Sequence, residues 1–165
     1  MVGPGAMGCL HAALLTEGGL RVGLLDHLPE RAARISAQGL ILEREGKVGR
    51  IAVPCSAEAR LVIILVKSWA TDAAVRACLP ACDERTLVLT LQNGLGNWER
   101  IAGHLPAERV LAGTSSTGAT LLAEGAVRLA GLGQARLGSP VGRLDRAQEA
   151  ADLLNSGKVP AEVIV

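Results

Sequence analysis

The chain opens with "MVGPGAMGCL", residues 1–10, and this stretch decides the predicted fold. Gly3, Gly5 and Gly8 have the Gly-x-Gly-x-x-Gly spacing that is typical of the strand-to-helix loop in dinucleotide-binding domains. The first glycine permits a tight turn, the second lets a pyrophosphate approach the backbone, and the third allows close helix packing. A turn that needs glycine for shape alone is the alternative. Because only Met1 and Val2 precede the loop, we interpret them as the end of a first strand of about five or six residues.

The rest of the chain alternates short apolar runs with amphipathic segments. Helices are predicted at residues 6–17, 29–38, 98–105 and 143–155, with another beginning after a Ser68 cap, and Asn97 is the predicted cap of the helix at 98–105. Strands are predicted at 20–25, 60–67, 86–94 and from 161, with a hairpin across 40–53 and glycine-separated strands across 109–139. This alternation predicts one α/β domain over residues 1–165, with a Rossmann-like, doubly wound, mostly parallel sheet and extra edge strands.

Composition excludes several classes of function. The 17 basic and 16 acidic residues give a formal net charge of +1 without a basic stripe, and aromatic residues make up 1% of the chain. Nucleic-acid binding therefore has neither an electrostatic footprint nor stacking platforms. The longest apolar run, residues 61–66, is far shorter than the ~20 residues that span a bilayer. We therefore expect a cytoplasmic protein that binds neither nucleic acid nor membrane.

The four cysteines do not have a metal-binding pattern. Cys78 and Cys82 lie in a predicted helix, with no second Cys or His pair nearby, and Cys9 and Cys55 are far from them in the sequence. We interpret them as small packing residues in a reducing compartment, and we expect no metal site.

Candidate ligand-binding residues follow the predicted strands, at the edge where doubly wound sheets bind ligands. Asp26 ends the strand at 20–25 and lies 18 residues after Gly8, near the spacing of a ribose-binding carboxylate. A carboxylate there favours NAD over NADP, and the nearest cations for a 2′-phosphate are Arg31 and Arg34. A solvated turn aspartate is the alternative interpretation.

Lys67 and Asn93 follow the next two buried strands. Each is a predicted contact to cofactor or substrate, although Lys67 would also suit a strand end that reaches solvent and Asn93-Gly94 is a turn pattern in its own right. The stretch "GTSSTGA", residues 113–119, would line a nicotinamide pocket or form a tight sheet crossing.

Taken in order, the motifs resemble the ketopantoate reductase (2-dehydropantoate 2-reductase) family. They are "GPGAMG" at 3–8, "VKSW" at 66–69, "QNGLGN" at 92–97, "GTSSTGAT" at 113–120 and then "GAVRLAGLG". The resemblance covers essentially the whole chain and corresponds to the N-terminal cofactor domain of the family. It implies the reduction of 2-dehydropantoate, a small 2-keto acid, to pantoate with NADPH, on the route to coenzyme A.

The same resemblance assigns roles to individual residues. The pyrophosphate would be held by Gly3, Pro4, Gly5, Ala6, Met7 and Gly8. Lys67 and Asn93 would line the cofactor and substrate crevice, and Ala119 would lie beside the nicotinamide. Family members often carry arginine where His27 aligns, so Asp26-His27 favours NAD here although the family uses NADP.

The family also has a helical second domain, whose first long helix supplies the general-acid lysine. We expect that lysine beyond Val165, no catalytic residue within this chain, and a homodimer for the full-length form. The domain is thus predicted to be truncated at both ends. The alternatives are a catalytically incomplete dinucleotide-binding module and another Rossmann 2- or 3-hydroxyacid dehydrogenase.

Overall fold

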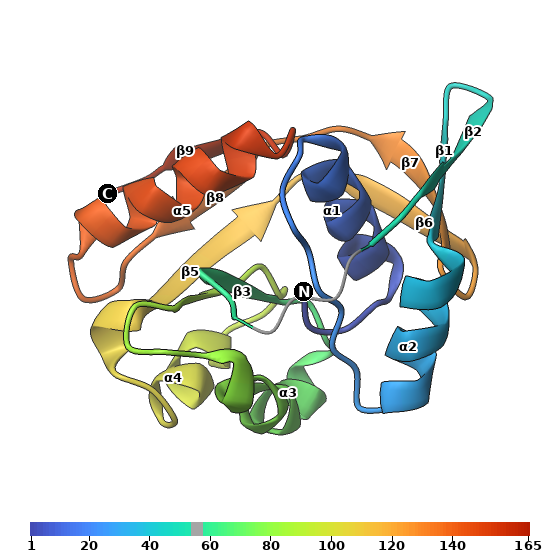
Figure 1. The fold of residues 1–165 in the computed structure, drawn as a ribbon. Helices are drawn as coiled ribbons and strands as arrows, with labels where there is room; N and C mark the ends of the chain where they lie inside the picture. The colour runs from blue at the N-terminus through green and yellow to red at the C-terminus, as the bar shows by residue number, and fades with distance from the viewer. Residues whose placement is uncertain (54–57) are drawn as a thin grey trace.

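The computed structural model describes residues 1–53 and 58–165, and its elements follow the predicted alternation (Figure 1). The α-helices are α1 (Ala6–Glu17), α2 (Pro29–Gln38), α3 (Thr71–Cys78), α4 (Asn97–Ala102) and α5 (Leu144–Ser156). The strands are β1 (Leu40–Arg44), β2 (Lys47–Ile51), β3 (Leu61–Ile64), β4 (Leu87–Thr90), β5 (Val110–Ser115), β6 (Gly118–Ala123), β7 (Ala126–Gly131), β8 (Ala135–Gly138) and β9 (Ala161–Val163). Short 3-10 helices are η1 (Ser68–Ala70), η2 (Leu79–Ala81) and η3 (Ala107–Arg109).

Within the described residues the strands form two sheets. The first has the order β3-β4-β5-β8-β9, with β3, β4 and β5 parallel and β8 antiparallel to β5. Val2 adds a parallel bridge to Ile64 of β3 and another to Leu25, so residues 1–3 continue this sheet beyond β3. A mostly parallel sheet extended at one edge by β8 and β9 is the predicted architecture.

Successive residues of the parallel strands serve opposite faces of the first sheet. Ile63 and Leu89 pack with α1 and α5 in one core, whereas Val62 and Val88 pack with α3 and α4 in a second core. Both faces are therefore covered by helices, which explains why these strands read as continuous apolar runs. This confirms the prediction of a doubly wound, Rossmann-like α/β fold.

The second sheet differs from the sequence-based expectation of edge strands alone. Its order is β2-β1-β7-β6, with β1 parallel to β7 and the other pairs antiparallel. Helix α1 contacts this sheet as well and lies between it and the first sheet (Figure 1). Thus β6 and β7 join the predicted hairpin in a separate layer, because the hairpin offers them a free edge.

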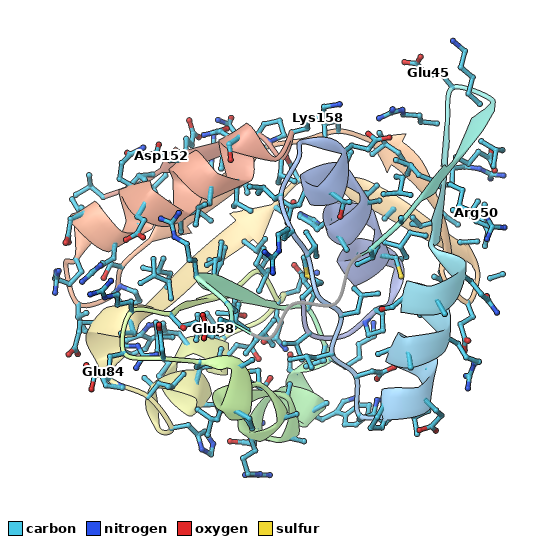
Figure 2. All side chains as sticks on the ribbon, in the orientation of Figure 1. Glu45, Arg50, Glu58, Glu84, Asp152 and Lys158 are labelled. Atoms are coloured by element: carbon cyan, nitrogen blue, oxygen red, sulfur yellow. The ribbon has the colours of Figure 1, made fainter. Side chains whose placement is uncertain are left out.

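The β1–β2 hairpin confirms the turn predicted at Glu45-Gly46. Both residues have positive φ angles, 50° and 72°, which matches the backbone of a two-residue hairpin turn. Figure 2 shows Glu45 at the far tip of the hairpin and Arg50 nearer its base, where the Arg50 guanidinium donates to the carbonyl of Gln38 at the end of α2. The hairpin therefore projects into solvent and takes no part in the candidate site.

The predicted strand at residues 20–25 is wrong for most of its length. Of these six residues, only Leu25 pairs within the described part of the chain, by its bridge to Val2. The preceding residues border an open groove instead of a neighbouring strand. A segment without a partner cannot form a ladder, however strong its β-propensity.

Candidate functional site

The loop at residues 3–8 has the backbone shape that its three glycines predict. Gly3 has a φ of +90°, and a Cβ on Gly8 would lie 2.0 Å from the Gly3 carbonyl oxygen. A Cβ on Gly5 would meet no atom within 4 Å, and Gly5 is exposed. The first and third glycines are thus required for the turn and for packing, and the second faces open space.

Helix α1 begins at this open position. In the described structure its N-cap, Gly5, makes no side-chain capping bond, and no acidic residue lies in the first turn. The amides of Ala6, Met7 and Gly8 begin the helix, where N–H groups have no partner within the helix and the helix dipole is positive. Such an end is suited to bind a phosphate group.

Pro4 and Cys9 fix the underside of the loop. Pro4 is buried, and its carbonyl accepts a hydrogen bond from the Cys9 Sγ at 3.2 Å. Burial raises the pKa of the Cys9 thiol to about 11, which keeps the thiol in its donating form. The loop is therefore held from below while its upper side stays open.

Asp26 lies next to the loop, because the amide of Gly3 donates to the carbonyl of Leu25 at 2.9 Å. Its side chain is 1% exposed and paired with Arg31 through Oδ2 and with His27 through Oδ1, the latter at 2.7 Å. Burial alone would raise the pKa of this carboxyl. The hydrogen bond and charge of Arg31, together with Leu28 and His27, outweigh burial and hold the pKa below its usual range.

Lys67 and Asn93 lie on neighbouring loops. A Cβ on Gly3 would be 2.7 Å from Cγ1 of Val66, so the glycine loop adjoins the residue before Lys67. The Ser68 hydroxyl donates to the Asn93 carbonyl at 3.3 Å, which ties the two loops together. Lys67 and Asn93 are both exposed. The structure thus brings the glycine loop, Asp26, Lys67 and Asn93 to one edge of the sheet, as the sequence predicts.

A polar network beneath these loops was not predicted from the sequence. The Gln92 amide donates to the Val66 carbonyl at 2.8 Å and to the Thr71 hydroxyl at 3.0 Å. Thr71 is also within hydrogen-bond distance of Oδ1 of buried Asn97, at 3.3 Å. Gln92 therefore links the ends of β3 and β4 to the start of α3. Its place directly after a buried strand was the available sequence signal.

Two predicted helix caps are wrong. Ser68 begins η1, and the cap position of α3 is Ala70, because the Ser68 hydroxyl bonds to Asn93 instead. Asn97 lies inside α4, whose cap is Gly96 in a left-handed conformation. The Asn97 amide donates to the carbonyls of Asn93 and Gly94 at 3.1 and 3.2 Å. Both side chains stabilise the loops of the site instead of starting a helix.

The stretch at residues 113–119 forms the crossing between the two sheets. Thr117 exchanges hydrogen bonds with Gly133, and Ser116 does so with Gln134. Their hydroxyls thus stabilise the crossing. A tight sheet crossing was one of the two interpretations of this stretch from the sequence. Ala119 follows on β6 and is half-buried, and β6 contacts α1.

Two exposed apolar side chains border the site and were missed at the level of sequence. Trp69 is 81% exposed and follows Lys67 by two residues, and Leu95 is fully exposed between Gly94 and Gly96. The sequence signal that could have identified them was a large apolar residue close to the end of a predicted strand.

Other chemistry is limited in the described residues. No group of three or more His, Cys, Asp or Glu side chains is arranged to hold a metal ion in that part of the chain. Cys9, Cys78 and Cys82 are free thiols, and Cys55 lies outside the described residues. Among the helices described, none is both long enough and apolar enough to cross a membrane.

The fold and the glycine loop define a Rossmann-like α/β domain. Comparison with known proteins gives a finer assignment, because the ketopantoate reductase PanE/ApbA family matches residues 1–142. The chain belongs to this family.

Individual relatives agree with the family assignment. A 2-dehydropantoate 2-reductase from Halobacterium salinarum is 37% identical over 98% of this chain, and one from Mycobacterium tuberculosis is 34% identical over 93%. These matches cover 55% and 51% of the two relatives, so the chain spans about half their length.

Solved structures show the same relationship. 2-Dehydropantoate 2-reductase from Geobacter metallireducens has a TM-score of 0.82 and 27% identity, over 99% of this chain and 56% of that one. A ternary structure of D-mandelate dehydrogenase with NADH and anilino(oxo)acetate has a TM-score of 0.89 and 26% identity, over 99% of this chain and 57% of that one.

Proposed function

We propose that this chain is the cofactor-binding half of an NAD(P)H-dependent reductase that acts on a small 2-keto acid of the ketopantoate type. The observation that carries the proposal is the open position at Gly5. There the uncapped end of α1 meets the edge that bears Asp26, Lys67 and Asn93. Membership of the ketopantoate reductase family supports the same reaction class.

The residues of the loop fit the pyrophosphate of a dinucleotide. The first amides of α1, from Ala6 to Gly8, are placed to donate hydrogen bonds to it, and Gly5 leaves room for its oxygens. Asp26 and Arg31 form an ion pair beside the loop. One of the two is proposed to contact the adenosine ribose.

Lys67 and Asn93 are proposed to orient the reacting end. The ammonium of Lys67 is suited to the carboxylate of a 2-keto acid, and the Asn93 amide is able both to donate and to accept a hydrogen bond. When bound, a reduced nicotinamide supplies a hydride to the keto carbon. The gain from these two residues lies in orientation and charge stabilisation.

The general acid is proposed to be a lysine outside this chain, as the family resemblance implies. In the described residues the site is an open edge, which does not exclude water from a reacting carbonyl. We therefore expect the isolated chain to bind a dinucleotide and to catalyse little or no reduction.

Titration of the purified chain with NADH and NADPH, followed by nicotinamide fluorescence, tests binding. Saturable enhancement is expected, and the absence of a response at millimolar concentration would overturn the binding proposal. Asp26→Ala should weaken NADH more than NADPH, since only the carboxylate accepts bonds from both ribose hydroxyls. The opposite order would show that Asp26 does not favour NAD.

A second substrate class is favoured by the likeness to D-mandelate dehydrogenase. It is distinguished by adding ketopantoate or anilino(oxo)acetate to the chain saturated with NADPH or NADH. A further change in nicotinamide fluorescence with ketopantoate alone supports the ketopantoate assignment. A change with anilino(oxo)acetate alone would favour the mandelate-type reaction.

A further inference from the structure

Two cysteines lie next to each other in a compact turn at the end of α3. Cys78 is the last residue of α3, and η2 follows it directly. The Cys82 amide donates to the Leu79 carbonyl at 3.0 Å, and the Cys82 thiol donates to the Cys78 carbonyl at 3.2 Å. The turn therefore holds the Cys82 sulfur against the residue that carries the other thiol.

The two thiols differ in their exposure to solvent. Cys78 is fully buried, and it belongs to the core that contains Val75 and Ile101. Its thiol donates to the Val75 carbonyl at 3.2 Å. Cys82 is half-buried and packs against the border of the same core. A reagent in solution is therefore able to reach Cys82 but not Cys78 in the folded chain.

The surroundings of Cys82 favour its thiolate. A hydrogen bond from the Cys78 thiol and the charge of the Arg109 guanidinium outweigh burial and the Asp83 carboxylate, and they lower the pKa of Cys82 to about 7. The same hydrogen bond, together with burial, raises the pKa of Cys78. Since the thiolate is the reactive form of cysteine, the accessible sulfur is the nucleophile and the buried one stays protonated near neutral pH.

Hydrogen bonds fix the two charged groups that lie near Cys82. The Arg109 guanidinium donates through Nε to the Thr86 carbonyl at 2.9 Å and through Nη2 to the Asp83 carbonyl. The Asp83 carboxylate accepts from the Thr86 amide at 2.8 Å and from the Thr86 hydroxyl at 2.9 Å. The cation is thus held close to the turn, while the carboxylate has hydrogen-bond partners of its own.

We propose that Cys78 and Cys82 form a reversible modification site that reacts with low-molecular-weight disulfides. The Cys82 thiolate attacks one sulfur of the small disulfide, which forms a mixed disulfide at Cys82 and releases one small thiol. Cys78 Sγ then attacks Cys82 Sγ, which forms the Cys78–Cys82 bond and releases the second small thiol. The small disulfide is reduced to two thiols, the two cysteines are oxidised to one disulfide, and their two protons end on the released thiols.

The short separation of the two cysteines makes the bridge reversible. Only Leu79, Pro80 and Ala81 lie between them, and so short a loop restricts the unfolded chain less than a long one. The bridge therefore adds little stability, and small thiols are able to reopen it by the reverse exchange. Such a bridge responds to the ratio of small thiol to small disulfide and does not act as a permanent cross-link.

Peptide mapping of the intact chain after incubation with oxidised glutathione tests the proposal. Trypsin releases both cysteines in one peptide, residues 77–85, whereas Cys9 and Cys55 fall in peptides 1–21 and 51–60. We expect peptide 77–85 to lose two hydrogen atoms and to regain them with dithiothreitol. Before oxidation, iodoacetamide at neutral pH should alkylate Cys82 at least about tenfold faster than Cys9, because the pKa of Cys9 is raised to about 11.

Two variants separate the two steps of the exchange. Cys78→Ala should stop at the mixed disulfide, so that peptide 77–85 gains one glutathionyl group on Cys82. Cys82→Ser should show neither the adduct nor the bridge, because the remaining thiol is buried.

Mapping of the intact chain decides the proposal even where a variant does not fold. A glutathione adduct that persists on Cys82, a disulfide from Cys82 to Cys9 or Cys55, or no reaction at peptide 77–85 overturns it. So does alkylation of Cys82 that is no faster than that of Cys9.

Discussion

The Nε of Arg31 donates to Oδ2 of Asp26, and the Asp26 side chain is 1% exposed. The carboxylate that would bind the adenosine ribose is therefore already neutralised by a cation from α2. The pair contains both groups that distinguish the two dinucleotides, a carboxylate suited to ribose hydroxyls and a cation suited to a 2′-phosphate. The Arg31 side chain is 31% exposed and the Asp26 side chain 1%, so Arg31 is the partner that is open to a ligand, and Asp26 would have to exchange a present partner to bind a ribose.

Arg31→Ala should shift preference toward NADH. The substitution removes a cation and leaves the Asp26 charge to repel a 2′-phosphate, so we expect NADPH affinity to fall at least about tenfold and NADH affinity to fall less. Fluorescence titration with both dinucleotides gives the ratio. An equal loss for both would mean that Arg31 acts only on the structure.

The same substitution should destabilise the fold. It leaves a buried carboxylate with His27 as its remaining side-chain partner, at an expected cost of about 1 to 3 kcal/mol in the free energy of unfolding. Arg34→Ala is the matched control on α2, because its pair with Glu124 is exposed and should contribute nothing measurable. Urea unfolding of both variants makes the comparison.

Gly5→Ala should separate binding from stability. A Cβ on Gly5 meets no atom within 4 Å, so the free energy of unfolding should fall by no more than about 1 kcal/mol, the cost of alanine at an N-cap. The methyl group would occupy the space of a pyrophosphate oxygen, and dinucleotide affinity should fall at least about tenfold. Gly131→Ala is equally unhindered but lies in β7, and it should leave both quantities unchanged.

Gly8→Ala completes this series with the opposite outcome. Its Cβ would lie 2.0 Å from the Gly3 carbonyl oxygen, so the helix must move away from the loop. We expect a loss of at least about 2 kcal/mol in the free energy of unfolding. Near-normal stability in this variant would contradict the packing role of the third glycine.

Gln92 and Asn93 are adjacent in sequence and should behave differently. Gln92→Leu leaves the Val66 carbonyl and the Thr71 hydroxyl without their amide partner, at an expected cost of about 1 to 3 kcal/mol. Asn93→Ala removes an exposed side chain and should change stability by less than about 0.5 kcal/mol while weakening ligand binding. Unfolding and fluorescence titration, measured for both variants, distinguish a residue that stabilises the site loops from a residue that contacts the ligand.

The sequence predicted those parts of the fold whose cause is local. The bounds of α1 and α2 match the predicted ranges because Gly18 and Gly39 end their apolar periodicity. The hairpin follows from Glu45 and Gly46 in the same way. Assembly of the site loops was also predictable, since parallel strands bring their carboxyl ends to one edge.

The errors have long-range causes. Ser68 and Asn97 are residue types that often cap helices. Here their side chains donate hydrogen bonds to the loop after β4 instead. Arg31 was identified as a cation near the ribose position, yet its pairing with Asp26 depends on where α2 docks. The separate second sheet forms because β7 pairs with β1, and the local sequence pattern of β7 does not specify its partner strand.

The pH dependence of stability should report two buried basic groups. Burial lowers the pKa of the Met1 amino group from its usual 8.0 to about 6 and also lowers the pKa of His11. The unfolded chain then binds more protons than the folded chain, between pH 8 and 6 for Met1 and below about 6.5 for His11. Since stability rises with pH wherever the unfolded state binds more protons, unfolding free energy should fall as the pH is lowered from 8.

The slope cannot exceed about 1.4 kcal/mol per pH unit for one proton, and urea unfolding at pH 8, 7 and 6 measures it. Acetylation of the Met1 amino group should make the curve shallower between pH 8 and about 6.5, because the chain end then takes up no proton there. The Cys82 thiol, whose pKa is lowered to about 7, should keep a smaller slope of the same sign above pH 7. The decline below about 6.5 should persist after acetylation and disappear in His11→Leu. A slope that acetylation leaves unchanged would show that the Met1 ammonium is not buried in the folded protein.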